Sequence, residues 1–221
     1  MVYSTTYHGN SSIGIFSVAC DNIAFVPPDA PGKFIYAIKE RLGVDVVKTS
    51  LMESNLLGIY GRAYRDILLI PYNVSEREER LLKEYVDVVK VKTKWNAIAN
   101  NIVFNDRGAI INPELGRDVK SFLEDALGVE IAMRKIANYP TVGSLLVVSD
   151  RGAIVHYKAS DDDLNVIKDI FGLKYYPIKT TVNLGVGFVK IGLINNNRGY
   201  VVGEGTTGIE VSRIEEGLYS D

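Results

Sequence analysis

The 221-residue chain has little of the chemistry on which catalytic and disulfide-bonded proteins depend. It holds one cysteine, Cys20, and two histidines, so an internal disulfide is excluded and general bases are scarce. A chain of this kind suits a reducing compartment, and we expect a cytoplasmic protein. Its first residues lack a basic segment followed by an apolar run, so we predict no signal peptide. No stretch reaches the ~20 apolar residues that a membrane-spanning helix requires, and we expect no membrane contact.

The charge balance excludes a general polyanion binder. The formal net charge is −2 at pH 7, so any contact with nucleic acid must come from a local basic face. Apolar residues make up 47% of the chain, which is enough to build a core and excludes global disorder.

A short repeat indicates how the chain is organised. The pentapeptide Asp-Arg-Gly-Ala-Ile occurs at 106–110 and again at 150–154, with its glycines 44 residues apart. Each copy lies between two runs of apolar and β-branched residues, which predicts a β-hairpin with a turn of residues that tolerate positive φ. Hairpins with similar turns are predicted to start near Ile13, Leu57 and Val189.

A helix and a further strand are predicted after each hairpin. The helical segments are 32–43, 75–86, 116–128, 160–172 and 206–218. Ser75 with Glu78, and Thr207 with Glu210, have the spacing of capping boxes. Gly43, Gly128 and Gly172 are placed to end their helices. Strands are predicted after the first four helices, at 44–50, 86–93, 129–137 and 173–181, so the unit is strand–strand–helix–strand.

The fifth unit lacks its last strand, and residues 2–9 have the composition to supply it. Landmark residues two to three positions into each predicted first strand keep a spacing of 41 to 47 residues, and the phase also closes across the two ends of the chain; they are Gly14, Gly58, Ala99, Gly143 and Lys190. We therefore predict an α+β fold, a closed ring of five units sealed by the N-terminal strand. The expected single domain, 1–221, divides into repeats at about 10–50, 51–93, 94–137, 138–181 and 182–221.

Several motifs resemble one family. The segments SIGIFSV, LLGIYG, NDRGAIINPEL, PTVGSLLVVSDRGAIVH and GYVVGEGTTGIEVSRIEEGL occur in this order along the chain. Together they are similar to archaeal translation initiation factor 6, whose fold is the pentein or α-β propeller. Two landmarks depart from the glycine usual there, Ala99 and Lys190, and the long regulated tail of the eukaryotic relatives has no counterpart after the fifth helix.

The resemblance implies a binding protein without catalysis or cofactor. Family members bind the face of the large ribosomal subunit that meets the small subunit, and so prevent premature joining of the two. Their main partner is a ribosomal protein near the sarcin-ricin region, with contact to ribosomal RNA, and the eukaryotic members also act in large-subunit biogenesis. We expect the same function here, and a monomer, since a closed ring leaves no strand edge to pair.

The alternative function is a guanidine-modifying enzyme, because the pentein ring also carries amidinotransferases and hydrolases. Cys20 would be the nucleophile, and His8 or His156 the base. Nothing in their spacing brings either histidine close to Cys20, and an isolated thiol is poorly activated. In these enzymes the cysteine lies near the C-terminus, so we favour a buried structural cysteine.

The acidic run at 161–163 does not predict a metal site. Asp161, Asp162 and Asp163 form an acidic run, but they open a predicted helix, where carboxylates complement the positive end of the helix dipole. The glycines of GVGF and GEGTTG do not have the spacing of a phosphate-binding loop. We expect no metal.

The binding face is predicted where each third strand leads into the next unit. Basic residues gather there: Lys48, Lys92, Lys94, Arg134, Lys135 and Lys179. The predicted ribosome-binding residues are Asn10, Ser12, Gly14, Asn55, Gly58, Lys92, Lys94, Asn96, Asn100, Gly143, Ser144 and Lys190. Asn100 matches a family asparagine and is the first candidate. Two alternatives stay open: the lysines could be merely solvated, and the glycines could serve only packing.

Overall fold

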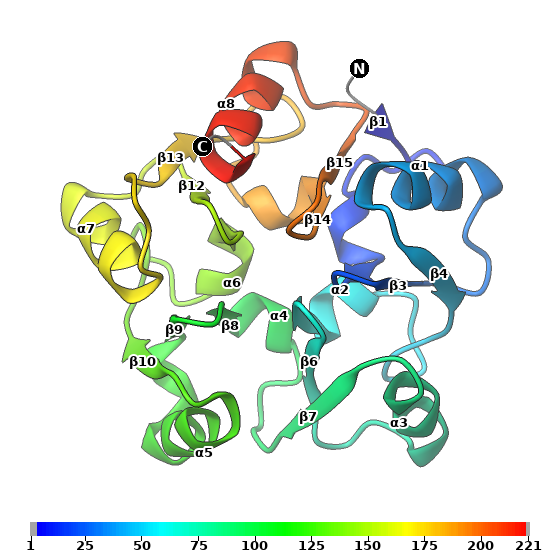
Figure 1. Ribbon diagram of the computed structural model, residues 1–221, viewed down its shortest axis with the longest axis horizontal. Coiled ribbons are helices and arrows are strands. Elements are labelled where there is room, and N and C mark those ends of the chain that lie inside the picture. The colour runs from blue at the N-terminus through cyan, green and yellow to red at the C-terminus, as the bar shows by residue number, and fades with distance from the viewer. Residues whose placement is uncertain (1–3, 220–221) are drawn as a thin grey trace.

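The computed structural model describes residues 4–219 and contains five three-stranded sheets around a common centre (Figure 1). The first two strands of each sheet form an antiparallel hairpin. In units one to five these hairpins are β2 (Val18–Ala19) with β3 (Ile23–Val26), β5 (Arg62–Tyr64) with β6 (Ile67–Pro71), β8 (Ile102–Phe104) with β9 (Gly108–Ile111), β11 (Leu146–Val148) with β12 (Ala153–His156), and β14 (Leu193–Asn195) with β15 (Tyr200–Gly203).

A third strand runs parallel to the second in every sheet. In units one to four it follows a helix, as β4 (Asp45–Lys48), β7 (Asp87–Val91), β10 (Glu130–Met133) and β13 (Ile178–Thr180). In the fifth sheet it is β1 (Ser4–Thr5), which pairs Ser4 with Val202. The N-terminal strand predicted at 2–9 is therefore present but short. Residues 2 and 3 lie outside the described part, and Tyr7–Asn10 is a tight turn.

One long helix per unit covers the outside of the sheets (Figure 1). These helices are α1 (Gly32–Leu42), α3 (Glu76–Lys83), α5 (Arg117–Leu127), which follows a 3₁₀ turn η2 (Pro113–Leu115), α7 (Asp161–Ile170) and α8 (Gly208–Tyr219). The predicted caps are confirmed. The Ser75 hydroxyl accepts from Glu78 N–H, Thr207 and Glu210 cap each other, and Gly43 ends α1 in the left-handed conformation.

The long helices also join neighbouring units. Helix α1 belongs to the first unit but contacts β15 and β1 of the fifth, and α8 contacts β12 and β13 of the fourth. On α1, Phe34, Ile38 and Leu42 are fully buried in a cluster that includes Ile194 and Val201 of the fifth unit. Apolar burial at ~25 cal/mol per Å² therefore stabilises the boundaries between units as well as the units themselves.

The sequence predicted that the landmark residues lie in the first strands, but this is wrong. Each landmark residue lies on a short helical turn that precedes its hairpin. These turns are η1 (Ile13–Ile15), α2 (Leu57–Tyr60), α4 (Ile98–Asn101), α6 (Val142–Leu145) and η3 (Val189–Gly192). They meet at the centre of the molecule, where each contacts two others. An apolar run of this length cannot be assigned to helix or strand by periodicity alone.

Glycine at a landmark lets the central turns touch. A Cβ on Gly58 would overlap the carbonyl oxygen of Gly14 in the preceding unit, and one on Gly143 would overlap that of Ala99. Gly14 meets the carbonyl oxygen of Lys190 in the same way. The glycines are thus required by close approach of backbone to backbone.

The hairpin glycines have a role that differs from the predicted one. Gly108, Gly152 and Gly199 do not have positive φ. Instead, a Cβ on Gly108 would overlap the carbonyl oxygen of Ile170 at the end of α7. A Cβ on Gly152 would likewise overlap a carbonyl oxygen of α8, and one on Gly199 a carbonyl oxygen of α1. The preceding polar side chain bonds the same helix end, since Asn105 Nδ2 donates to Phe171 O at 3.1 Å. The repeated turn is a contact between units.

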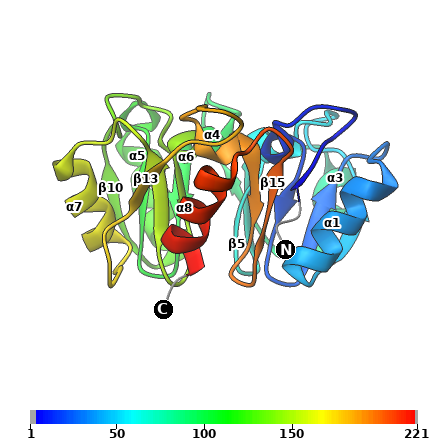
Figure 2. The same ribbon diagram turned by 90° about the horizontal axis from the view of Figure 1, so that it is seen from above.

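The two ends of the molecule carry different loops (Figure 2). The hairpin turns and the last turns of the long helices lie at one end. At the other end lie the loops that precede the central turns, at 6–12, 49–56, 92–97, 134–141 and 181–188. We call this second end the loop rim. None of the helices within residues 4–219 is long and apolar enough to cross a bilayer.

Candidate functional site

Four of the five loops on the loop rim share a tight turn. Residues with positive φ form it, at 8–9, 52–53, 137–138 and 183–185. In three of these loops, a carboxylate near the start of a long helix accepts a hydrogen bond from a backbone N–H of the turn. Glu78 accepts from Glu53 N–H at 3.0 Å, Asp163 from Ala137 N–H at 3.1 Å, and Glu210 from Gly185 N–H at 2.9 Å. Four of the five loops therefore have a compact turn of similar form.

The loop of the third unit, 92–97, is different. No residue in it has positive φ, and it carries two exposed lysines. Lys92 Nζ lies 5.6 Å from the centre of the exposed Tyr72 ring, and Lys94 Nζ lies 5.4 Å from that of Trp95. Within residues 4–219 neither lysine has an ion pair. This loop offers cations and aromatic faces together.

Two of the other predicted rim cations, Arg134 and Lys179, form ion pairs with acidic residues at the start of α7. Arg134 contacts Asp162 at 2.8 Å and Asp163 at 3.2 Å. Lys179 lies 3.7 Å from Asp161. The reason is the parallel topology, which brings the end of a third strand next to the acidic start of a helix.

Lys48 and Lys135 have different surroundings from these pairs. Lys48 Nζ donates to Ala30 O at 3.4 Å, and Lys135 is exposed. The predicted rim cations that are exposed and have no ion pair within residues 4–219 are therefore Lys48, Lys92, Lys94 and Lys135.

Two predicted asparagines on the rim are already engaged. Asn10 is exposed, and its Oδ1 accepts from Ser12 N–H at 2.8 Å. Ser12, half-buried, precedes η1 without capping it through its side chain. Asn55 is exposed, and its Nδ2 donates to Asp29 at 3.0 Å and to the Tyr7 hydroxyl at 3.2 Å. Asn55 thus joins the first two units.

Asn96 and Asn100 are the asparagines with unused side chains. Both are half-buried in or next to the third-unit loop, and their side chains make no hydrogen bond within residues 4–219. The neighbouring Asn101 differs, since its Nδ2 donates to Ala97 O at 2.8 Å. Asn100 therefore presents an amide that a partner could bond.

The remaining predicted residues lie inside the molecule. Gly14, Gly58 and Gly143 are buried between the central turns, as described above. Ser144 is also buried, and its hydroxyl donates to Thr141 O at 2.8 Å. Lys190 does not lie on the loop rim surface either; it lines the cavity at the centre.

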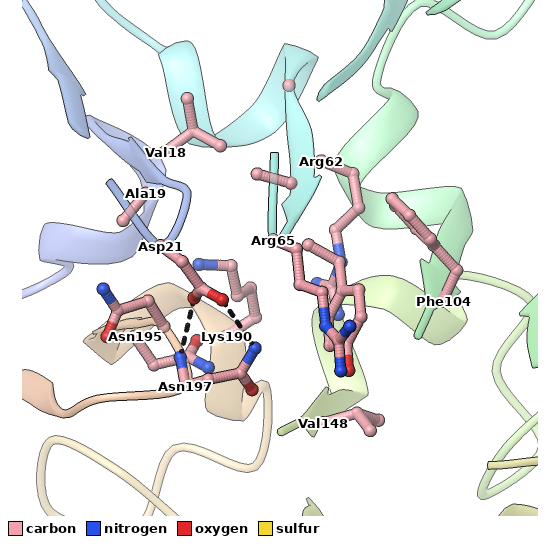
Figure 3. A pocket seen from close by; sticks show the side chains of 14 residues that line it. Val18, Ala19, Asp21, Arg62, Arg65, Phe104, Val148, Lys190, Asn195 and Asn197 are labelled. Carbon is pink, nitrogen blue, oxygen red and sulfur yellow. Dashed lines mark hydrogen bonds between the residues drawn. The ribbon is translucent and has the colours of Figure 1, made fainter. Parts of the chain in front are cut away.

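The central cavity has a volume of about 30 Å³ and is lined by the first strands of all five sheets (Figure 3). Arg62 is buried, and its Nη1 donates to Gly143 O at 3.3 Å. Lys190 Nζ donates to Leu193 O at 3.3 Å. Burial lowers the pKa of Arg62 to about 10, and burial together with the Arg62 charge lowers that of Lys190 to about 7. Sequence reasoning missed Arg62, whose strand reads as an ordinary hairpin.

The three residues of the enzyme alternative lie apart. Cys20 is buried at the hairpin end of the first unit, whereas His8 lies on the loop rim, where its Nε2 is 3.4 Å from Asp29. His156 is in β12 of the fourth sheet, stacked on Tyr157. Burial, then the charges of nearby aspartates, raise the pKa of Cys20 and hold it as the unreactive thiol.

The acidic run of the fourth unit caps its helix. Ser160 and Asp163 form a capping box at the start of α7, and Asp161 and Asp162 pair with rim cations. Among residues 4–219 there is no group of three or more acidic, histidine or cysteine side chains arranged to hold a metal ion.

Known proteins resemble the chain along nearly its whole length. The model of the eIF-6 family matches residues 2–217. Translation initiation factor 6 of Natronomonas pharaonis is 41% identical over 212 residues, and that of Pyrobaculum arsenaticum is 36% identical over 214 residues, each covering 95% of both chains. The factor of Pyrococcus abyssi is 34% identical over 96% of both chains. On this evidence the chain belongs to the eIF-6 family.

Proposed function

We propose that this protein is a translation initiation factor that binds the large ribosomal subunit at its intersubunit face and prevents premature association with the small subunit. Membership of the eIF-6 family supports a role in translation initiation, and its relatives are named as factors rather than enzymes. The binding itself is our inference from the family resemblance and from the loop rim.

We also infer that the five units form one domain, a closed ring of the pentein type. The parallel pairing of β1 with β15 and the contacts of each central turn with two others support this architecture. In a closed ring, equivalent loops from all five units lie on one face, so a single rigid surface faces the partner.

The third-unit loop is the observation that carries the proposed binding face. It departs from the tight turn of its four counterparts, and it presents Lys92 and Lys94 without ion pairs. Departures from a repeated local pattern concentrate at functional sites. Lysines next to exposed aromatic rings suit contact with ribosomal RNA phosphates and bases.

Polar side chains extend this face around the loop. Asn96 and Asn100 flank the lysines, while Asn10 and Asn55 lie on the rim of the first two units. We assign the contact to these exposed and half-buried side chains, with a ribosomal protein near the sarcin-ricin region as main partner. The predicted glycines and Ser144 are buried behind this face, and the half-buried Lys190 lines the central cavity.

Co-sedimentation tests the proposal most directly. The purified protein is mixed with large subunits, with small subunits, and with both under conditions in which they join. Binding to large subunits alone, together with a loss of joined particles, is the expected result. Binding to neither subunit, or joining that proceeds normally with the factor bound, would contradict it.

The catalytic alternative has no comparable support. Cys20 is buried at the hairpin end of the molecule, whereas His8 lies on the loop rim at the other end, so this thiol is neither accessible nor beside that histidine. Incubation with arginine and agmatine, followed by an assay for citrulline, urea and ammonia, checks this. Turnover that disappears in a Cys20→Ala variant would establish an enzyme instead.

A further inference from the structure

Two basic side chains line the same cavity at the centre of the molecule. Arg62 comes from β5 of the second unit, and Lys190 comes from η3 of the fifth. Both line the central cavity (Figure 3). Each donates one hydrogen bond to a backbone carbonyl, Arg62 to Gly143 and Lys190 to Leu193. A lysine ammonium has three N–H donors and an arginine guanidinium has five, so these two bonds use only a minority of the donors.

No carboxylate pairs with either cation among residues 4–219. Asp21 is the acidic residue that lines the cavity, and its two oxygens accept from Asn197, at 3.1 Å from the backbone N–H and 3.0 Å from the side chain. A third cation in the lining, Arg65, is held by Asp106 at 3.0 Å and Asp150 at 3.4 Å. The acidic groups nearby therefore already have partners.

The placement of the buried Arg62 near the half-buried Lys190 is costly without a counter-charge. A buried charge that is neither paired nor fully hydrogen-bonded is strongly unfavourable. Two like charges close together in a site of low dielectric add a repulsion that solvent screens poorly. A bound anion between them would remove both penalties, and the unused N–H donors would bond it.

We propose that the central cavity is a binding site for a monatomic anion, chloride in the cell, held between the Arg62 guanidinium and the Lys190 ammonium. The cavity volume of about 30 Å³ holds one or two water-sized groups. That size fits a halide and is small for a tetrahedral oxyanion such as phosphate.

The landmark pattern explains how the site arises. Three of the five central turns carry glycine at the landmark and one carries alanine, so their side chains contribute little to the centre. Lys190 replaces that small residue in the fifth turn and fills the space with a charged chain. Burial and the Arg62 charge hold the pKa of Lys190 near 7, and a bound anion would favour the charged form and raise it. This inference does not depend on ribosome binding.

Thermal unfolding in two salts tests the site. The full chain is heated at pH 7 in sodium chloride or sodium gluconate of equal ionic strength, so that general screening is the same in both. A ligand that binds only the folded state raises Tm, and we expect chloride to raise it by roughly 3 °C in a saturable manner. The difference should vanish in Lys190→Met, whose flexible side chain fills the same space.

A control variant and a bromide-containing crystal complete the test. Lys120→Met removes a surface lysine and should keep the full chloride effect. A crystal grown with sodium bromide should show an anomalous peak between Arg62 and Lys190, which needs no variant to fold. Equal Tm values in the two salts for the wild type, or bromide peaks on the outer surface only, would overturn the proposal.

Discussion

The carbonyl oxygen of Gly14 occupies the space that a side chain on Gly58 would need. The two residues lie on the central turns of adjacent units, and the same relationship recurs between Ala99 and Gly143. The close approach of these turns therefore depends on glycine at positions 58 and 143, where the methyl group of alanine would already overlap the neighbouring backbone.

Gly58→Ala should lower the free energy of unfolding by about 1–3 kcal/mol, because the added methyl group must displace the backbone of the first unit. Urea denaturation measures the loss. Gly32→Ala is the matched control, since nothing lies within 4 Å of its Cβ and alanine is favoured in a helix. Equal stability of the two variants would show that the central turns can separate freely.

Lys190 should make stability depend on pH. Its pKa is about 7 in the folded chain and 10.5 ordinarily, so the unfolded chain binds the additional proton between these values. The free energy of unfolding from this group therefore rises as pH increases from about 7 towards 10, by up to ~1.4 kcal/mol per pH unit. Below pH 7 both states are protonated and the slope disappears.

The comparison with Lys190→Met isolates this contribution, because tyrosines and other groups titrate in both proteins. Urea denaturation of wild type and variant between pH 6 and pH 9.5 should give curves that converge as pH rises. Parallel curves would mean that Lys190 keeps its ordinary pKa.

Reversing the charge of the third-unit loop should weaken large-subunit binding. In the double variant Lys92→Glu and Lys94→Glu, the logarithm of the binding constant should depend less steeply on the logarithm of the salt concentration. The slope should be shallower by about one to two, because each lost phosphate contact reduces it by about one. Sedimentation at several salt concentrations gives the slope. Lys39→Glu with Lys120→Glu changes the charge equally on the outer helices and should leave the slope unchanged.

Alanine substitutions at Asn100 and Asn101 should have different effects, one on large-subunit binding and the other on stability. Asn100→Ala should weaken large-subunit binding without changing the free energy of unfolding, because its side chain makes no hydrogen bond within the described chain. Asn101→Ala should instead cost ~1–3 kcal/mol of stability, since it leaves Ala97 O and Asn112 Nδ2 without their partner. The assignment of Asn100 would be wrong if only Asn101→Ala impaired binding.

Cys20 should resist thiol reagents while the chain is folded. It is buried, and its pKa is raised, so the reactive thiolate is suppressed. Reaction with dithiobis(nitrobenzoic acid) should be slow in native buffer and rapid in urea. Fast labelling of the native protein would place the thiol at an accessible, activated position.

Features that depend on neighbouring residues could be predicted from the sequence. The capping pair Ser75 and Glu78 needs only one turn of helix, and Gly43 needs only the end of its own helix. The hairpins follow from alternating apolar runs around a polar turn. These local rules are also the reason that the five units could be recognised as repeats.

Features that depend on another unit could not be predicted. The hairpin glycine Gly108 is explained by the carbonyl oxygen of Ile170, 62 residues away in the chain. Arg62 and Lys190 come from different units to line one central cavity, and the rim pair of Arg134 with Asp162 joins a strand end to a helix start. Sequence spacing contains no signal for such contacts, so the sequence did not place Lys190 at the central cavity or pair Arg134 with Asp162.

The pairing of Ser4 with Val202 has a consequence for the order of folding during synthesis. Ser4 and Thr5 are translated about 200 residues before Val202 and Gly203, the residues with which they pair. At about 5–20 residues per second, this strand stays unpaired for tens of seconds. The fifth sheet, and with it the boundary between the fifth and first units, can therefore be completed only after Val202 and Gly203 have been translated.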